Sequence, residues 1–287
     1  MSALTVVRAG ALTTVQDLGR PGHAHLGVPR SGALDEPAHR LANRLAGNPE
    51  DSATLETTVN GCAVRTDTAE TAVVTGAPCP VRIDGRPAAW GAPLRVPAGA
   101  VLEAGPAAAG LRSYVAFAGG IAVPPVLGSR SRDLLSGLGP EPLTEGVTLP
   151  LGAPYGPPGA ADAVPFPAPP TGGLVLPVVL GPRDDWFTPE ALRALAGGGF
   201  AVSPASNRIG LRTEGPALTR ARTGELPSEG MALGAVQVPP DGRPVVFLAD
   251  HPTTGGYPVV GVVPEPALAA AAQAVPGTPV RFVPVRA

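Results

Sequence analysis

The chain has 287 residues and a formal net charge of −2, and all 21 of its basic residues are arginine, because lysine does not occur. Without lysine there is no Walker A phosphate-binding loop, no Schiff-base nucleophile, no Ser-x-x-Lys acyl-transfer pair and no residue that carries biotin, lipoate or pyridoxal phosphate. The near balance of charge and the absence of a basic run exclude nucleic acid as an expected partner.

Glycine and proline number 38 each, and apolar residues make up 44% of the chain. This apolar content is enough to offset the entropy of ordering, so we expect a folded protein of one or two domains. Apolar runs such as residues 174–180 are too short to cross a membrane, and the start of the chain lacks a cationic region followed by an apolar stretch. We therefore expect a cytoplasmic protein without a membrane partner.

Short runs of β-forming residues, bounded by Gly, Pro, Asn or Asp, predict a mainly β fold with a barrel or sandwich arrangement. The predicted strands cover residues 4–8, 13–17, 70–75, 94–96, 112–118, 174–180, 234–238, 245–249 and 281–285. Residues 112–118 alternate between two sets of side chains, which predicts a strand in the wall of the fold. Residues 245–248 form a continuous apolar run, typical of a strand covered on both faces.

Three short helices have recognisable end signals. Asp35 is a suitable N-cap for a helix that Gly47 ends. Thr188 is a suitable cap for residues 189–196, where proline at the first position costs no hydrogen bond. The third predicted helix covers residues 266–274.

The proline-rich residues 156–170 have almost no periodic pattern and predict a semi-rigid linker. The linker divides the chain into an N-terminal β-barrel-like lobe, residues 1–155, and a C-terminal lobe, residues 171–287.

Cysteine and histidine give little indication of a metal site. Cys62 and Cys79 have no C-x-x-C spacing and are expected to be buried thiols. His23 and His25 have no carboxylate or thiol at ligand spacing, so we expect a pair on a surface loop and no metal. His39 and His251 remain as possible bases.

The standard catalytic signatures are missing, so polar side chains in glycine-rich turns are the remaining candidates. The first cluster comprises Gln16, Asp17, Arg20 and Ser31, in turns that Gly and Pro fix. The alternative is that these residues only stabilise the turns, with Asp17 and Arg20 paired across a bend.

Two further clusters follow predicted strands. Ser129, Arg130 and Ser131 follow residues 112–118 and precede a short helical turn. Their hydroxyls, amides and guanidinium would suit a carboxylate or phosphate, although a capped surface turn explains them equally. Asp250, Thr254 and Tyr257 come directly after the buried strand 245–249, where glycine lets the backbone approach a ligand closely. We favour this last cluster as the functional rim.

With these clusters and the SNRIG turn, the chain resembles the family called allophanate hydrolase subunit 2, also known as KipA-like or biotin-dependent carboxyltransferase-like. Its bacterial members include the C subunit of 5-oxoprolinase. The resemblance covers nearly the whole length. It rests, in order, on the motifs TVQDLGRPG, GVPRSGALD, NRLAGN, AGGI with VLGSRSRD, GPRDDWF, SNRIG, GAVQVP and TTGGYP.

The resemblance implies a fold of cyclophilin-like β-barrel lobes and a role as one component of an enzyme. The implied partners are a KipI-like B subunit and a LamB/YcsF-like A subunit, which together with this chain open the small-molecule substrate 5-oxoproline to L-glutamate with ATP hydrolysis. ATP is expected to be shared with or bound by the partner subunits, no biotin is expected on this chain, and the isolated chain is expected to be inactive.

The resemblance also supplies candidate site residues, position by position. The catalytic candidates are Asp250, Arg130 and Arg208. The substrate-binding candidates are Gln16, Asp17, Arg20, Ser31, Asp35, Ser129, Asn207, Gln237, Thr254 and Tyr257. The sequence departs from the family pattern at Arg183 and at His251. These differences bear on the identity of the substrate more than on the fold.

Two other functions fit the same family. One is a urea- or amide-processing carboxyltransferase, or an allophanate hydrolase-related subunit, which receives a carboxyl group from a biotin on another protein. The other is a non-enzymatic, KipA-like antagonist of a kinase inhibitor, which only binds its partner.

Overall fold

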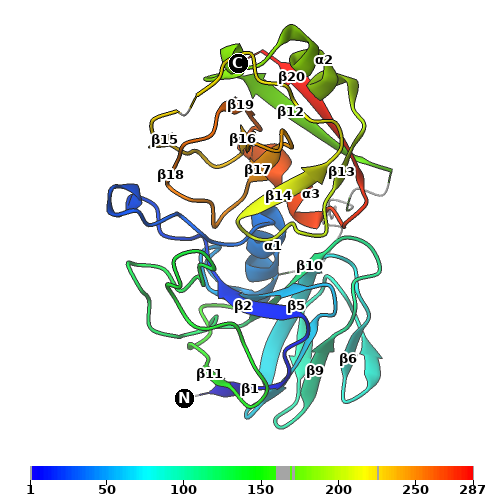
Figure 1. Ribbon diagram of the computed structural model, residues 1–287. Coiled ribbons are helices and arrows are strands. Elements are labelled where there is room, and N and C mark those ends of the chain that lie inside the picture. Colours follow the sequence, from blue (N-terminus) through cyan, green and yellow to red (C-terminus); the bar gives the residue numbers. More distant parts are fainter. Residues whose placement is uncertain (1, 160–168, 170–171, 225, 287) are drawn as a thin grey trace. The chain divides into compact units, whose positions relative to one another are not determined.

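The computed structural model describes residues 2–159, 169, 172–224 and 226–286 (Figure 1). The chain forms two compact units, neither of which is continuous in sequence. The first comprises Met1–Arg20, Ser31–Asp133 and Gly137–Pro169; the second comprises Pro21–Arg30, Leu134–Ser136 and Pro170–Ala287. The predicted lobes differ from these units, because they leave residues 21–30 and 134–136 in the N-terminal part. Most of the predicted linker lies outside the described residues.

The first unit contains two antiparallel sheets. The six-stranded sheet consists, in spatial order, of β11 (Thr148–Pro150), β1 (Ala3–Arg8), β4 (Cys62–Thr66), β9 (Val101–Ala104), β6 (Val81–Ile83) and β7 (Arg86–Ala88). The five-stranded sheet consists of β2 (Leu12–Gln16), β3 (Thr54–Thr58), β10 (Arg112–Phe117), β5 (Glu70–Gly76) and β8 (Leu94–Val96). The two sheets share one apolar core.

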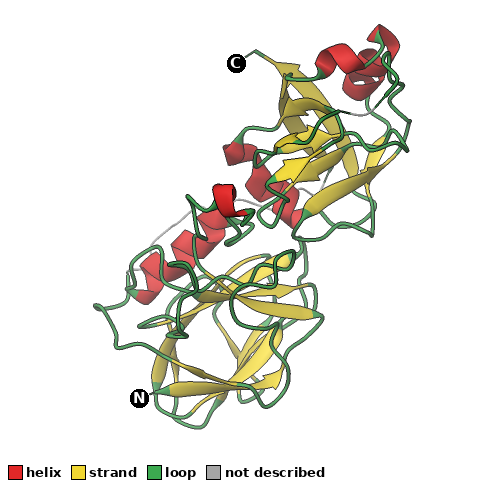
Figure 2. Cartoon of the chain, turned by 60° about the vertical axis from the view of Figure 1, so that its left-hand side comes forward, coloured by secondary structure: helices red, strands yellow, loops and turns green. Residues whose placement is uncertain are grey.

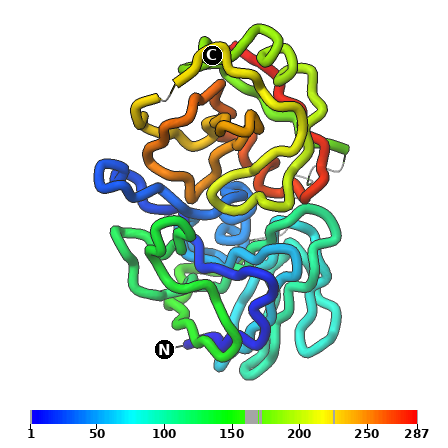
Figure 3. Tube along the Cα trace, viewed as in Figure 1, coloured from blue at the N-terminus to red at the C-terminus, as the bar shows by residue number. Residues whose placement is uncertain are grey.

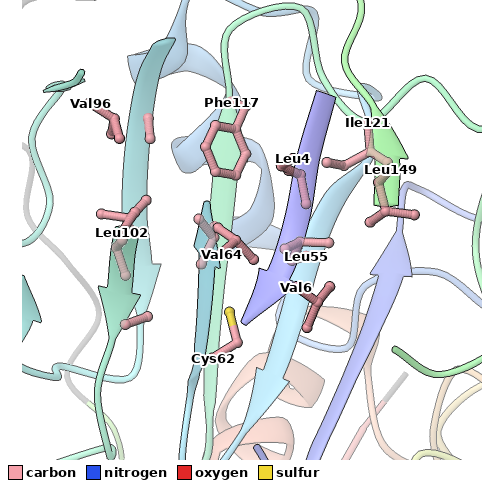
Figure 4. Packing of buried hydrophobic residues seen from close by; sticks show 14 of the residues in the cluster. Leu4, Val6, Leu55, Cys62, Val64, Val96, Leu102, Phe117, Ile121 and Leu149 are labelled. Atoms are coloured by element: carbon pink, nitrogen blue, oxygen red, sulfur yellow. The ribbon is translucent and has the colours of Figure 1, made fainter. Parts of the chain in front are cut away.

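That core is built by alternate side chains of facing strands (Figure 4). Leu4 and Val6 of β1 point into it from the first sheet, and Leu55 of β3 and Phe117 of β10 point into it from the second. Because successive side chains of a strand point to opposite faces, the intervening residues are left for other contacts. Cys62 also lies in this core, where burial raises the pKa of its thiol to about 12.

Helix α1 (Glu36–Ala46) covers the other face of the five-stranded sheet. The side chain of Asp35 caps its first turn and Gly47 ends it with a positive φ of 76°, as the sequence predicts. Leu41 and Leu45 of α1 pack with Tyr114 and Ala116 of β10. Strand β10, predicted as a strand in the wall of the fold, is therefore buried on both faces, because its alternate residues face a helix instead of solvent.

The second unit contains a closed barrel of seven strands. All seven strands follow residue 172, so they belong to the green-to-red part of the tube in Figure 3. In order around the barrel these are β12 (Leu174–Leu180), β19 (Val259–Val262), β16 (Ala235–Gln237), β17 (Val245–Phe247), β14 (Gly210–Glu214), β13 (Phe200–Val202) and β20 (Pro279–Val285). The parallel pairing of β12 with β20 closes the ring. A separate two-stranded ribbon joins β15 (Glu229–Gly230) to β18 (Thr254–Gly255).

The remaining elements are short helices (Figure 2). They are α2 (Pro189–Gly197), α3 (Leu268–Gln273) and the single-turn 3-10 helices η1 (Ala24–Leu26), η2 (Asp184–Trp186) and η3 (Glu265–Ala267). The predicted mainly β class and cyclophilin-like barrel architecture are confirmed, and each predicted strand overlaps an observed one. Among the described helices, none combines the length and apolar character that a membrane crossing requires. Cys62 and Cys79 are buried free thiols, as expected.

Candidate functional site

Asp17 follows β2 directly and accepts four hydrogen bonds, three of them from a distant segment of the chain. Its Oδ1 atom accepts from the amide of Gly19 at 2.8 Å and from the hydroxyls of Ser129 and Ser131 at 2.6 Å each. Its Oδ2 atom accepts from the amide of Arg130 at 2.6 Å. We call these five residues the Asp17 frame. The buried carboxylate is thus surrounded by donors, which offsets the loss of water.

The two serine hydroxyls of the frame are engaged within the protein. Ser129 Oγ donates to Asp17 and accepts from the amide of Ser131 at 3.0 Å. Ser131 Oγ donates to Asp17 and accepts from the amide of Asp17 at 2.9 Å. Both side chains are completely buried, so in this structure they hold residues 129–131 in place.

Arg132 joins the same segment to β2 through its main chain. Its amide donates to the carbonyl of Val15 at 2.9 Å, and its carbonyl accepts from Gln16 Nε2 at 2.9 Å and Ser31 Oγ at 3.1 Å. Ser31 has a φ of 56°, an uncommon conformation for a residue with a side chain. Gln16 is completely buried, and its Oε1 atom has no hydrogen-bond partner among the described residues. Gln16 and Ser31 therefore lie beside the frame.

Arg20 supports the frame from the interior. It is only 1% exposed, and its guanidinium donates to the carbonyls of Ser131 and Val126. Val126 and Ser129 pair across a tight turn in which Leu127 and Gly128 both have positive φ. A buried guanidinium that bonds to main-chain carbonyls fixes the shape of this turn.

Arg130 is half-buried, and its guanidinium is anchored at one edge only. Its Nε donates to the carbonyl of Val123 at 2.8 Å, while its main-chain amide belongs to the frame. Within the described residues, Nη1 and Nη2 have no hydrogen-bond or ion-pair partner. The terminal edge of a guanidinium matches the two oxygens of a carboxylate or phosphate. Arg130 therefore presents a held positive charge that suits an anion.

Asp35 has a structural role as the N-cap of α1. Its Oδ1 accepts from the amide of Ala38 at 3.1 Å, and its own amide donates to the hydroxyl of Tyr114 at 2.8 Å. The Tyr114 hydroxyl in turn donates to Glu56 Oε2 at 2.8 Å. Burial, together with the charge of Glu56, raises the pKa of Tyr114 well above its usual value, so the phenol remains a donor.

His39 on α1 is completely buried, and its hydrogen bonds identify its tautomer. Asn43 Oδ1 accepts from Asn48, so its Nδ2 faces His39 Nε2, at 3.3 Å, as the donor. Nε2 is then the acceptor, and Nδ1 carries the proton that bonds to Thr54 Oγ1 at 2.9 Å. Burial lowers the pKa of His39 from 6.5 to about 4, partly opposed by the charges of Asp17 and Glu56. The imidazole is neutral near pH 7 and links α1 to Thr54 of β3.

Arg208 and Asp250 of the second unit form a buried ion pair. Arg208 Nε and Nη2 donate to the two Asp250 oxygens at 2.9 and 3.1 Å, in a bidentate geometry. The two residues are 1% and 0% exposed. Asp250 Oδ2 also accepts from the amide of Leu134 at 3.0 Å. These contacts favour a role in holding the unit together over contact with a substrate.

The other candidates of the second unit lie in turns and at the barrel rim. Asn207 is exposed, and its Oδ1 accepts from the amides of Ile209 and Gly210, which is a turn interaction. Gln237 is buried, and its Nε2 donates to the carbonyl of Tyr257 at 3.3 Å. Tyr257 is 45% exposed.

Two exposed groups lie near this rim. The guanidinium of Arg220 lies 5.9 Å from the centre of the Tyr257 ring, and Thr254 is exposed on β18. Thr254 and Tyr257 are therefore accessible to a ligand. Arg183, where the sequence departs from the family pattern, pairs with Glu229 and lowers the pKa of that carboxyl group.

The structure gathers the candidates into one cluster in the first unit and two pairs in the second. The first-unit cluster contains Gln16, Asp17, Arg20, Ser31, Ser129 and Arg130. The pairs are Arg208 with Asp250, and Gln237 with Tyr257. Ser131 was part of the second predicted cluster but was not assigned to the substrate, and Gly19 was not predicted, although both lie in the motifs that carry the other residues. In the described part of the chain, no three His, Cys, Asp or Glu side chains are placed to hold a metal ion.

Comparison with known proteins agrees with the resemblance seen in the motifs. A family model described as the carboxyltransferase domain, subdomains A and B, matches residues 26–284. The Escherichia coli (strain K12) protein named as the C subunit of 5-oxoprolinase is 38% identical over 283 residues, which cover 98% of this chain and 90% of that protein.

Urea amidolyases match the same length of this chain but are much longer. The Lachancea kluyveri urea amidolyase is 34% identical over 312 residues, which cover 99% of this chain and 17% of that protein. The crystal structure of the K. lactis urea amidolyase superposes with a TM-score of 0.92 at 31% identity, over 99% of this chain and 19% of that one. The chain therefore belongs to the carboxyltransferase-domain family, subdomains A and B, in which the motifs had placed it.

Proposed function

We propose that this chain is the C subunit of an ATP-dependent 5-oxoprolinase, which opens 5-oxoproline to L-glutamate together with partner subunits. The observation that carries the proposal is the match to the C subunit of E. coli 5-oxoprolinase, which covers 98% of this chain and 90% of that protein. By contrast, the chain spans only 17% of the matched urea amidolyase, so most of that protein has no counterpart here.

The chemistry of the substrate explains the requirement for ATP. A five-membered lactam re-forms easily after opening, so hydrolysis needs an activated amide. Transfer of the ATP γ-phosphoryl group to the lactam oxygen converts the amide into a better electrophile, and attack by water then breaks the C–N bond and releases phosphate. In this lysine-free chain, arginine is the permanently charged side chain that can balance phosphate charge. We place ATP on the partner subunits or at a site that this chain shares with them.

The partners follow from the same proposal. The E. coli relative is named as one subunit of its enzyme, so that enzyme has other subunits. We propose a KipI-like B subunit and a LamB/YcsF-like A subunit as the partners of this chain. We expect the isolated chain to be inactive, and we place it in the cytoplasm, where ATP is available.

Two surfaces are the proposed contacts with substrate or partner. In the first unit this is the half-buried Arg130 beside the Asp17 frame. In the second it is the rim that carries Thr254 and Tyr257. Arg208 and Asp250 support that unit from its interior.

Reconstitution tests the proposal directly. The chain is co-expressed with a KipI-like and a LamB/YcsF-like protein of the same organism, and L-glutamate and ADP are measured with 5-oxoproline as substrate. We expect both products to form in the three-protein complex and to fall to background when this chain is omitted. Undiminished glutamate formation without this chain would overturn the proposal.

A carboxyltransferase is the second candidate, and the match to urea amidolyase over nearly the whole of this chain favours it. Because the chain has no lysine, biotin would have to be carried by another protein. The test adds biotin carboxylase, a biotinylated carrier protein and bicarbonate, and measures ATP hydrolysis that depends on urea. Urea-dependent turnover in this assay, with no glutamate from 5-oxoproline, would replace the first proposal by the second.

A further inference from the structure

We propose that Arg130 binds the carboxylate of a small-molecule acid and that Asp17 is the positioning residue that fixes Arg130 for this role. The proposal rests on the proposed function in one respect: it takes 5-oxoproline as the acid. It changes the expected role of Asp17 from a contact with substrate to support for the residue that makes the contact.

The first argument is the way in which Arg130 is held. Its main-chain amide is bound by Asp17 Oδ2 at 2.6 Å, and its Nε by the carbonyl of Val123 at 2.8 Å. A guanidinium can engage a carboxylate through the Nε edge or through the terminal edge formed by Nη1 and Nη2. Here Nε is occupied, so the terminal edge is left for the ligand. Because the side chain is already held, little rotamer entropy is lost on binding.

The second argument is electrostatic. Two other anchored arginines pair with carboxylates of the chain itself: Arg132 with Glu141 at 2.9 Å, and Arg208 with Asp250. Arg130 is anchored in the same way, but within the described residues no carboxylate lies within ion-pair distance of it. A half-buried guanidinium without a counter-charge attracts an anion more strongly than a fully solvated one. The missing carboxylate is then supplied by the ligand.

The third argument is the construction of the frame. Asp17 binds Arg130 and both neighbouring serine hydroxyls, and those hydroxyls have no donor left for a carboxylate ligand. Asp17 itself is 6% exposed. The frame therefore places the main chain of Arg130 and leaves contact with the ligand to its side chain. This is the behaviour of a positioning group, which acts through another residue.

Arg130→Ala in the three-protein complex tests the contact. Loss of a charge-assisted, bidentate contact is expected to raise KM for 5-oxoproline by about 10- to 100-fold, with a smaller change in kcat. Arg130→Lys keeps the charge but not the fork, so it should recover only part of the loss. Arg95→Ala is the matched control, because Arg95 is an exposed arginine of the same unit, on β8, and should leave KM unchanged.

A substrate without the carboxylate sharpens the test. In the wild-type complex, 2-pyrrolidinone should bind the 5-oxoproline site much more weakly than 5-oxoproline itself, as measured by competitive inhibition. If Arg130 contacts the carboxylate, Arg130→Ala should leave the inhibition constant of 2-pyrrolidinone unchanged, because the interaction is missing already. An equal loss of affinity for both compounds would overturn the assignment.

Asp17→Asn tests the positioning role. Asparagine cannot accept with both terminal atoms, so either the Arg130 amide or the serine hydroxyls lose their acceptor. We expect Asp17→Asn to raise KM in the wild-type background. In the Arg130→Ala background it should change KM little further, because both substitutions remove the same contact, that of Arg130 with the substrate carboxylate. A purely structural role would lower complex yield or kcat equally in both backgrounds. Ser129→Ala, which removes one donor to Asp17, is the milder second variant if Asp17→Asn does not fold.

The outcomes separate this inference from the proposed function. If the wild-type complex opens 5-oxoproline and Arg130→Ala behaves like Arg95→Ala, the inference fails and the function stands. If the wild-type complex does not open 5-oxoproline, the function fails, and calorimetric titration with 5-oxoproline, lactate and malonate decides the inference. Binding that is lost in Arg130→Ala supports it; equal binding, or none in the wild type, overturns it.

Discussion

The buried side chains of Asp17, Asp250 and His39 show two ways in which an ionisable group is accommodated in the interior. Asp17 and Asp250 remain surrounded by donors, in the first case amides and hydroxyls and in the second a guanidinium and an amide. The side chains that hydrogen-bond to His39 are neutral, and burial removes its charge instead. Burial is compatible with a charge only where hydrogen bonds replace water.

His39 predicts a specific dependence of stability on pH. Its pKa is about 4 in the folded protein and near 6.5 when unfolded, so between these values the unfolded state binds a proton that the folded state does not. The stability linked to His39 is therefore present above pH 6.5 and is lost as the pH falls towards 4. Between pH 7 and pH 5 the loss should be about 2 kcal/mol.

Urea denaturation of the wild type and of His39→Gln, at pH 7 and pH 5, measures this effect. The variant should be less stable at pH 7, because it loses packing against Tyr114. The gap between the two proteins should narrow at pH 5, because only the wild type has the histidine. A gap of the same size at both pH values would show that His39 is not held neutral.

At the scale of elements, helix ends could be predicted because their signals are local. Asp35 caps the beginning of α1 and Gly47 ends it. Thr188 caps the beginning of α2, with its hydroxyl 3.1 Å from the amide of Ala191. Packing across the sheet could not be predicted in this way. Strand β10 was predicted to lie in the wall of the fold, and its own sequence does not show that α1 covers its second face.

The cap of α2 carries a prediction of its own. Thr188→Ala removes the acceptor for the Ala191 amide and should lower the free energy of unfolding by about 1 kcal/mol. Thr188→Ser keeps the acceptor and should stay within a few tenths of a kcal/mol of the wild type. Chemical denaturation of the three proteins compares them. Equal losses in both variants would mean that the methyl group of Thr188, and not its hydroxyl, is what matters.

Strands with buried polar residues were missed for a related reason. Strand β3 has the sequence TLETT, and its Glu56 is buried because Tyr114, from another strand, donates to it. The pattern of β3 alone predicts no core strand, since burial of a carboxylate depends on a partner elsewhere. The candidate site shows the same limit: the motifs contain Asp17 and Ser129 separately, and their hydrogen bond spans 112 positions.

At the scale of the whole molecule, neither unit is one continuous segment. The second unit includes residues 134–136, and the amide of Leu134 donates to Asp250, the residue that pairs with Arg208. It also includes residues 21–30, where Arg30 pairs with Glu265 at an exposed position. The proline-rich sequence suggests dividing the chain near residue 170. A fragment that begins there would lack both of these segments of the second unit.

A fragment of residues 171–287 should therefore be less stable than the same barrel within the full chain. Asp250 would lose one donor, and a hydrogen bond to a charged group contributes about 2 kcal/mol. Amide hydrogens of β16 and β17 should then exchange about 30-fold faster in the fragment than in the full chain. Arg30→Ala in the full chain is the control; it should leave this exchange unchanged, because exposed ion pairs contribute little. Equal protection in the fragment and the full chain would show that residues 134–136 do not stabilise the barrel.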